Sequence, residues 1–269
     1  MSEKIRKVIF YLSFALVFAS CSDFSKIQKS NNLEEKLAAA MKYYEKKDYY
    51  KAGLLLDEIT PLLKGRQDAE KAQFYHAYTY YHQKQYIMSA YYFKDFVETY
   101  PRSDRAEEAM FMYAKSLYLD SPPYNLDQTN TYDAMEALQA FVTRFPNSAY
   151  MPEANKLSDE MREKLEYKDY VNCKIYNKIG NYKSAVVAFQ NFLDAYPTSK
   201  YAEEISFLQI QAQYNLAKNS VQGKKQQDRY YDVIEYYHDF IDKYPKSKYK
   251  KEAESMFDSS RQKLEQIKS

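Results

Sequence analysis

The sequence predicts an all-α protein built from helical hairpins that stack into one array. The first observation is a phrase that recurs four times: an aromatic residue, three further residues, a second aromatic residue, proline, any residue and serine. Its copies begin at Phe96, Phe141, Phe192 and Phe240. The second is that the chain contains only 4 glycines, which leaves little material for β-hairpins or phosphate-binding loops. The third is that apolar and aromatic residues between the phrases recur with the helical period.

Each copy of the phrase is interpreted as the end of one amphipathic helix and the start of another. A proline inside a helix loses a hydrogen bond and clashes with the preceding turn, so Pro101 stops the first of these helices. A serine side chain satisfies free N–H groups at a helix start, so we expect Ser103 to cap the next helix. Four such marks in one chain predict stacked helical hairpins.

The first twenty residues have the pattern of a secretory signal peptide. Three basic residues precede a largely apolar run at 8–19, which suits a signal peptide and is too short to span a membrane. The run ends in Phe18-Ala19-Ser20-Cys21, which resembles a lipobox with Phe18 in place of the usual leucine. We expect residues 1–20 to be removed and Cys21 to become a lipid-bearing, palmitate-modified N-terminus. The alternatives are a soluble periplasmic protein cut nearby, or a start without significance.

Residues 21–32 form a short, mostly polar segment, which is predicted to be a lipidated tether between the membrane and the folded array. A run of acidic residues directly after the cysteine is a surface-export signal in some lipoproteins. Here only Asp23 stands in that position. We therefore expect the periplasmic face of the outer membrane rather than the cell surface.

Residues 33–269 are predicted to form the array. In the clearest copy, Tyr86 is followed by Ser89, Phe93, Phe96 and Pro101, a spacing that resembles the second half of a tetratricopeptide repeat. The same spacing recurs along the chain and gives five tetratricopeptide-like hairpins in a right-handed superhelical array with a C-terminal capping helix. The approximate repeats are 33–66, 67–102, 103–147, 148–198 and 199–269.

The first helix of each repeat needs a small residue where two helices touch, and Ala40, Ala77 and Cys173 occupy that slot. Cys173 is therefore expected to be structural rather than reactive. Extra residues between the prolines predict three insertions: 121–131, a single long helix or two abutting helices between Pro152 and Gly180, and a polar loop at 219–229. A helix at about 250–267 is expected to cap the stack.

Charge and motif content exclude several function classes. The net charge is only +2, which argues against nucleic acid as the main partner, because counterion release needs clustered lysine and arginine. The chain has no P-loop, no nucleophile elbow and no paired metal spacing. His76 and His82 are six residues apart and fall on different faces of a helix, and His238 stands alone. We therefore expect no catalytic residues, no metal and no cofactor, and hence no enzyme.

Several stretches carry a family resemblance. The lipobox, the tether, the five repeats and three sequence stretches together resemble the BamD family in its Bacteroidetes-type form. The stretches are 91–96, 119–128 and Leu138-Gln139-x-Phe141. That family consists of outer-membrane lipoproteins of the β-barrel assembly machinery. The resemblance implies a non-enzymatic subunit that scaffolds the barrel subunit through its periplasmic domains. It also implies that the N-terminal repeats receive the terminal segment of unfolded outer-membrane proteins.

The candidate peptide-binding groove lies on the first helices of the N-terminal repeats, which line the concave surface of such arrays. Aromatic side chains there offer large, rigid contact area to an extended peptide, and a lysine at the groove edge is one candidate to meet a terminal carboxylate. The alternative is that several of these side chains simply pack between helices. The candidates are Tyr44, Lys71, Phe74, Tyr75, Tyr78, Tyr81 and His82.

Two other functions fit the repeats. One is another periplasmic tetratricopeptide lipoprotein that scaffolds a cell-wall or envelope complex. The other is a nutrient-binding lipoprotein of the SusD type, but those chains are much longer. The sequence does not assign the contact with the barrel subunit to individual residues.

Overall fold

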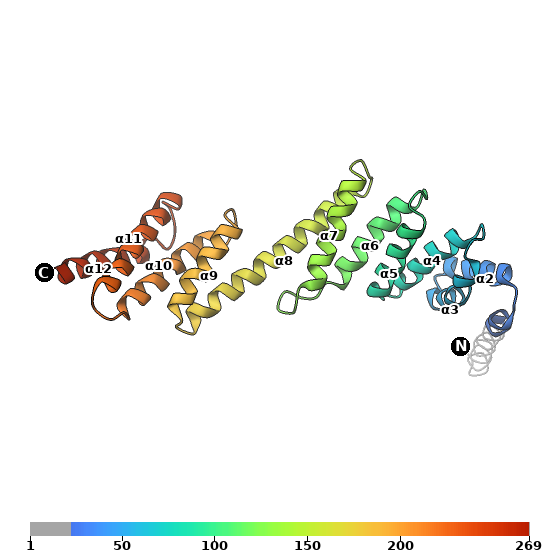
Figure 1. Cartoon of the computed structure of the whole chain (residues 1–269), viewed down its shortest axis with the longest axis horizontal. Coiled ribbons are helices and arrows are strands. Elements are labelled where there is room, and N and C mark those ends of the chain that lie inside the picture. The colour runs from blue at the N-terminus through green and yellow to red at the C-terminus, as the bar shows by residue number, and fades with distance from the viewer. Residues whose placement is uncertain (1–22, 269) are drawn as a thin grey trace, which may run out of the picture. The chain divides into compact units, whose positions relative to one another are not determined.

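A computed structural model describes residues 23–268, which form helices joined by short turns, with no strand in that range (Figure 1). This confirms the all-α hairpin fold. The predicted signal peptide and Cys21 lie outside the described residues. The elements in chain order are α2 (Leu33–Glu45), α3 (Tyr49–Ile59), the 3₁₀ turn η1 (Pro61–Leu63), α4 (Ala69–His82), α5 (Tyr86–Thr99), α6 (Ala106–Asp120), α7 (Thr129–Arg144), α8 (Met151–Lys178), α9 (Tyr182–Ala195), α10 (Ala202–Lys218), α11 (Lys224–Lys243) and α12 (Lys250–Lys268).

The chain divides into two compact units, which we call unit 1 and unit 2. Unit 1 comprises the chain up to Pro122 together with Leu126–Met161, and unit 2 comprises Pro123–Asn125 and Arg162 onward. The long helix α8 runs through the boundary, so the predicted insertion between Pro152 and Gly180 is one continuous helix. The predicted capping helix is α12.

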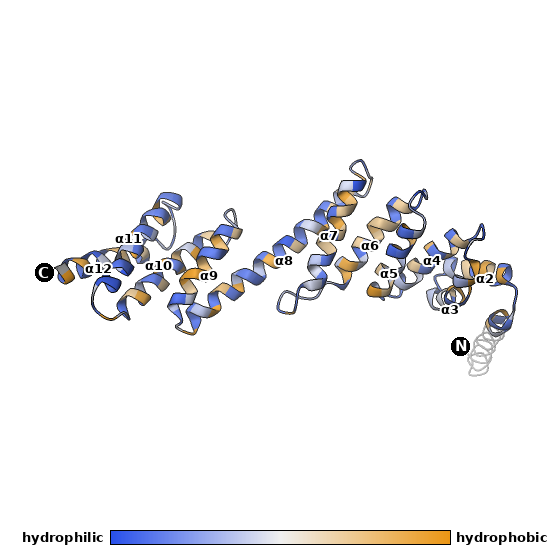
Figure 2. Cartoon of the chain, viewed as in Figure 1, coloured by the Kyte–Doolittle hydropathy of each residue, from blue (hydrophilic) through white to orange (hydrophobic). Residues whose placement is uncertain are grey.

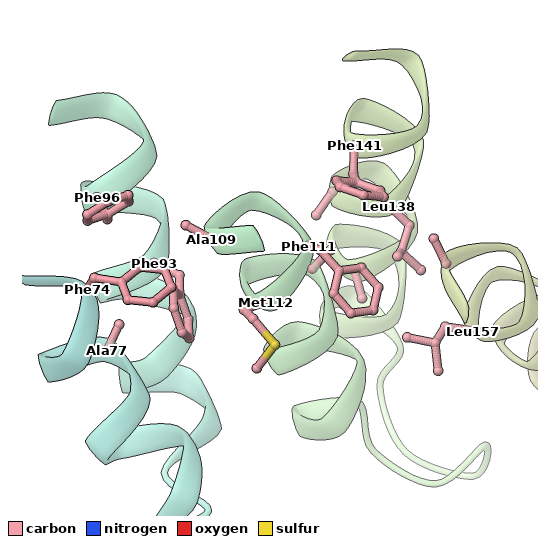
Figure 3. Packing of buried hydrophobic residues seen from close by; sticks show 14 of the residues in the cluster. Phe74, Ala77, Phe93, Phe96, Ala109, Phe111, Met112, Leu138, Phe141 and Leu157 are labelled. Atoms are coloured by element: carbon pink, nitrogen blue, oxygen red, sulfur yellow. The ribbon is translucent and has the colours of Figure 1, made fainter. Parts of the chain in front are cut away.

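Each unit is held together by aromatic and aliphatic side chains on the inward faces of its helices. In unit 1, the largest cluster contains Phe93, Phe96 and Phe141, each with no exposed surface (Figure 3). In unit 2, Phe189 and Ile205 are equally buried. Apolar residues alternate with polar ones along each helix, as the mixed colours of Figure 2 show, because only one face of each helix meets its neighbours.

The four proline phrases end their helices in the same way. The aromatic residue before each proline leaves the helical conformation, with φ between −123° and −131° and ψ near 60°. A residue that precedes proline disfavours the α conformation, which explains the stop. Its N–H still bonds the carbonyl four residues back, as Tyr100 does to Phe96 at 2.8 Å. The predicted helix ends are therefore confirmed.

The prediction that the serine caps the following helix is wrong. The N-cap residue of α6 is Arg105, and Ser103 lies two residues before it. Its hydroxyl oxygen accepts the N–H of Arg105 at 3.0 Å, and the hydroxyl donates to Glu70 on α4 at 2.7 Å. The serine thus closes a turn and ties it to the preceding first helix, because its short side chain suits such local bonds better than a cap two residues away.

This tie repeats, and we call it the serine clamp. Ser148 donates to Glu107 at 2.6 Å and Ser199 to Glu166 at 2.5 Å. The residue two positions after each serine covers an aromatic ring four residues after the glutamate. The pairs are Arg105 over Phe74 at 5.4 Å, Tyr150 on Phe111 at 4.6 Å and Tyr201 on Tyr170 at 4.0 Å; Tyr249 stacks similarly on Phe207 at 4.5 Å.

The expected tether and insertions differ in part from prediction. Residues 23–29 are helical, and Phe24 meets Tyr43 edge-on at 5.5 Å, so this segment packs on the first hairpin. The insertion at 121–131 keeps an irregular loop at 121–128, where buried Gln128 donates to the Leu126 carbonyl at 3.0 Å.

The insertion at 219–229 is mostly helical, and only 219–223 form a turn. Lys224 to Arg229 are good helix formers. Gln226 also closes the turn by donating to the Ala217 carbonyl at 3.1 Å, so the extra residues lengthen α10 and α11 instead of forming a loop. Within residues 23–268, none of the helices combines the length and apolar character that a membrane span requires.

Candidate functional site

A group of aromatic side chains lies where α2, α3 and α4 meet in unit 1. Tyr44 of α2 contacts Tyr75 of α4 at 4.9 Å and Tyr49 of α3 at 5.3 Å between ring centroids. His82 stacks on Tyr49 at 4.1 Å and lies near Tyr78 at 5.8 Å. The helical spacing of Tyr75, Tyr78 and His82 places all three on one side of α4. The structure therefore brings together most of the predicted groove residues.

A pocket of about 330 Å³ opens beside this group. Lys47 and Lys71 line it opposite a single acid, Glu45, so its charge balance is positive. Lys71 is exposed, and the ammonium groups of Lys47 and Lys71 form no ion pair or hydrogen bond with any other residue that the structure describes. The residues that line the pocket are Met41, Tyr44, Glu45, Lys47, Tyr49, Lys71 and Tyr75.

Phe74 does not belong to the groove, contrary to prediction. Only 4% of its surface is exposed, and its ring points toward Phe93 and Phe96 on α5, at 6.1 and 5.3 Å (Figure 3). The guanidinium of Arg105 covers it from the next hairpin. The serine clamp explains the burial, because the aromatic residue four positions after the clamp glutamate is the one that the following turn covers.

Tyr78 and Tyr81 are half-buried and point toward neighbouring first helices. The Tyr78 hydroxyl donates to Glu108 of α6, and burial together with that carboxylate raises the pKa of Tyr78. Tyr81 bonds Lys115 of α6, which pairs with Glu153 of α8 at 2.7 Å. These two tyrosines therefore brace α4 against α6, with only part of each ring available to a ligand.

His82 contributes an imidazole ring to this group of tyrosines. Burial, and then the positive charge of Lys47, lower the pKa of His82. The ring is therefore neutral at pH 7, and its Nε2 lies 3.2 Å from the Tyr44 hydroxyl, which can donate to it. A neutral imidazole offers stacking area and one polar contact, which suits peptide binding rather than acid–base chemistry.

The pocket also contains Lys47 and Tyr49, which were not predicted as site residues. Tyr49 is the first residue of α3. Lys47 lies in the turn between α2 and α3 with φ of 61°, a conformation that a lysine adopts rarely. The sequence feature that could have identified Lys47 and Tyr49 is the short turn after the first helix, because such a turn brings the start of α3 beside the end of α2.

Cys173 and His76, which could in principle be reactive, are buried in the packed interior. Burial raises the pKa of the Cys173 thiol to about 12, so the thiol stays protonated, as expected for a packed slot. His76 is buried, and its Nε2 lies 2.5 Å from Asp57 Oδ1. Among residues 23–268, no group of three or more histidine, cysteine, aspartate or glutamate side chains is arranged to hold a metal ion.

Comparison with known proteins gives one consistent family. The model of the YfiO family, described as outer membrane lipoproteins, matches residues 30–186 and 173–268. A relative in Aquifex aeolicus that carries the name of the outer membrane protein assembly factor BamD is 24% identical over 242 residues, covering 87% of this chain and 76% of the relative.

Further BamD proteins agree. The assembly factor of Rickettsia prowazekii is 23% identical over 168 residues, which cover 62% of this chain and 67% of that protein. Its counterpart in Neisseria meningitidis serogroup A is 20% identical over 216 residues, covering 74% and 81%. The match extends over nearly all described hairpins, and so the chain belongs to the YfiO family of outer membrane lipoproteins, the family of the assembly factor BamD.

Proposed function

We propose that this chain is a non-enzymatic subunit of the machinery that assembles outer-membrane β-barrel proteins. It is anchored by a lipid on Cys21 to the periplasmic face of the outer membrane. Its first two hairpins receive unfolded barrel proteins, and its C-terminal repeats hold the barrel subunit. The observation that carries the substrate role is the pocket of unit 1, where Tyr44 and Tyr75 lie beside Lys47 and Lys71.

The pocket suits an extended segment that ends in an aromatic residue. Tyrosine rings offer rigid apolar area and a polar tip, so they hold an aromatic side chain at little entropic cost. Lys47 and Lys71 offer ammonium groups that hydrogen-bond a terminal carboxylate, and such charge-assisted bonds are about twice as strong as neutral ones. We propose that unfolded barrel proteins present both features at their C-terminal segment.

The test is crosslinking of nascent barrel proteins to the membrane-anchored chain. Tyr75→Ala combined with Lys71→Glu is expected to lower the crosslink yield about tenfold, since together they remove ring area and reverse a charge. Tyr91→Ala is the matched control, because Tyr91 is an exposed tyrosine on α5 that does not line the pocket. Equal loss in both variants, or no loss in either, contradicts the assignment.

Scaffolding is tested separately by recovery of partners from detergent-solubilised outer membranes. The proposal expects a large β-barrel protein with soluble periplasmic modules to co-purify. Recovery of only peptidoglycan-linked or inner-membrane components would favour the alternative, a scaffold of another envelope complex.

Cys21→Ser tests the anchor: the variant is expected to leave the membrane fraction, and unchanged fractionation rejects lipidation.

A further inference from the structure

The serine clamp allows the first helices α4, α6, α8 and α10 to be aligned residue by residue. One aligned position is buried in three of these helices and exposed in α8. Nine residues after the clamp-position glutamates Glu70, Glu107, Glu203 and Glu166 stand Thr79, Ser116, Ala212 and Ile175. The first three residues have no exposed surface. Ile175, the largest and most apolar of the four, is 48% exposed.

A preceding helix covers this position in the other first helices. On α4, a Cβ placed on Gly53 of α3 would lie 3.3 Å from the Thr79 hydroxyl, so the two helices touch. On α6, the Ser116 hydroxyl lies 3.0 Å from that of Ser89 on α5. On α10, Ala212 packs in one cluster with Ala185 of α9. Small residues on the covering helix permit each close approach.

Within unit 2, no helix covers the equivalent position on the second half of α8. The first half of the helix supplies Ala154, Leu157 and Met161 to the core of unit 1, and the second half begins a new hairpin with α9. One residue after Ile175, Tyr176 is 44% exposed, and one turn on, Ile179 is 67% exposed. At the position of Ile179, α4 carries Gln83, which donates to the Tyr49 carbonyl of α3 at 3.3 Å.

A polar residue on the same face, three positions before Ile175, also lacks the hydrogen bond that its equivalents make. His76 on α4 bonds Asp57 of α3, and Gln209 on α10 bonds Gln190 of α9 at 2.8 Å. The equivalent residue of α8 is Asn172, which is exposed and whose side-chain amide makes no hydrogen bond to a described residue. A pocket of about 380 Å³ opens beside it between α8 and α9, with Cys173 and Ala188 in its wall.

We propose that this face of α8 and α9 docks an amphipathic helix of a partner protein, which lies where α3, α5 and α9 lie on the other hairpins. The chemistry of those helices specifies the partner: a small residue against Ile175 and apolar side chains toward Tyr176 and Ile179. Five residues after Ala52 and Ala185, the covering helices carry Asp57 and Gln190, so the docked helix carries a carboxylate or amide to meet Asn172. This surface is separate from the pocket of unit 1 and does not depend on substrate binding there.

The test is a photo-crosslinking amino acid at position 175 of the full chain in its native membrane, with the adduct mapped by mass spectrometry. Position 221 is the control, because Val221 is 90% exposed in a turn away from the face. The expected result is an adduct at 175, about tenfold above the control, on a helical segment with a small residue at the crosslinked site. An adduct on a β-strand, on lipid or on a second copy of this chain overturns the proposal, as does a yield equal to that of the control.

A second variant separates docking from folding. Ile175→Asp with Ile179→Asp places charges on side chains that are exposed in the free chain, so the thermal midpoint is expected to stay within about 2 °C. A photo-crosslinker at Asn172 in this variant should lose about nine-tenths of its adduct, because the apolar contact is gone. An unchanged adduct, or a large fall in the midpoint, contradicts an open docking face.

Discussion

Helix α4 and the second half of α8 are built on one sequence pattern and have different surroundings. Both carry a glutamate bonded by a serine of the following turn and, four residues later, an aromatic ring covered by that turn. On the opposite side, α4 is covered by α3, whereas α8 presents Ile175 and Ile179 to solvent. The recurring pattern therefore fixes how each hairpin meets the next one, and it leaves the face toward the preceding hairpin to be set by other residues.

The largest effect is expected in the packed cores, where the two units should behave alike. Phe93→Ala in unit 1 and Phe189→Ala in unit 2 each remove a ring with no exposed surface, which costs about 3–5 kcal/mol of the free energy of unfolding. Urea unfolding followed by circular dichroism measures it. A cost below about 1 kcal/mol in one unit only would show that its core is not packed as described.

Reciprocal exchange of one residue tests the difference between α4 and α8 directly. Thr79→Ile adds carbon atoms where Gly53 already touches, which should cost about 1–3 kcal/mol. Ile175→Thr changes an exposed side chain and should cost less than about 0.5 kcal/mol in the isolated chain. Equal costs in urea unfolding would contradict the account of a covered and an open face.

The serine clamps themselves should contribute less. Ser148→Ala removes the hydrogen bond to Glu107 and should lower the free energy of unfolding by about 1 kcal/mol. Ser247→Ala is the matched control: Ser247 accepts the N–H of Tyr249 at 3.0 Å, and no hydrogen bond from its hydroxyl to a glutamate is present among the described residues. The control should therefore cost measurably less. A larger loss in the control would refute the role assigned to the glutamate.

The smallest effect is a difference in pH dependence between two aspartates. Burial raises the pKa of Asp57, but hydrogen bonds from His76 and Tyr80 outweigh this effect and hold the pKa below the usual aspartate value of about 3.8. Its stabilisation is thus present above the unfolded pKa and is lost as the pH falls below about 3.8. The pKa of Asp232 in unit 2 shifts in the opposite direction, because burial and then the charges of Glu235 and Asp228 raise it.

Paired variants separate the two signs. The cost of Asp57→Asn at pH 7 should shrink as the pH is lowered through the region below 3.8, where the wild-type carboxylate is protonated too. Asp232→Asn should stabilise the protein slightly at pH 7, and this gain should disappear below pH 4. Urea midpoints at several pH values measure both, and the same trend in both variants would contradict the assigned environments.

The helices and their ends were predictable because proline and helical periodicity act locally. A helical stretch between Pro152 and Gly180 followed from the absence of proline and glycine there, but the sequence left open whether it is one long helix or two abutting helices. The role of Ser103 did not follow, because the choice between capping a helix and bonding Glu70 depends on how the chain is stacked. The helix at 23–29 was missed because its stability comes from Phe24 and Ile27 packing on the first hairpin rather than from its polar composition.

The candidate site was predictable to the level of helix faces. Tyr75 and His82 lie on one face of α4, as the helical period requires, and both contact Tyr44 of α2, while Lys71 lies at the pocket. Phe74 was assigned wrongly, because adjacent positions on a helix differ by about 100° and only the covering turn decides which side of the boundary is buried. Lys47 lies in a turn, where periodicity carries no information.

The claim that the pocket of unit 1 receives a chain terminus is tested most directly by equilibrium binding of one peptide in two forms. The peptide is the C-terminal segment of a barrel protein with an aromatic last residue, prepared as the free acid and as the amide. The full chain should bind the acid about tenfold more tightly, and Lys71→Ala with Lys47→Ala should remove that difference. Equal Kd values for acid and amide, or a preference that survives loss of both lysines, would contradict the claim.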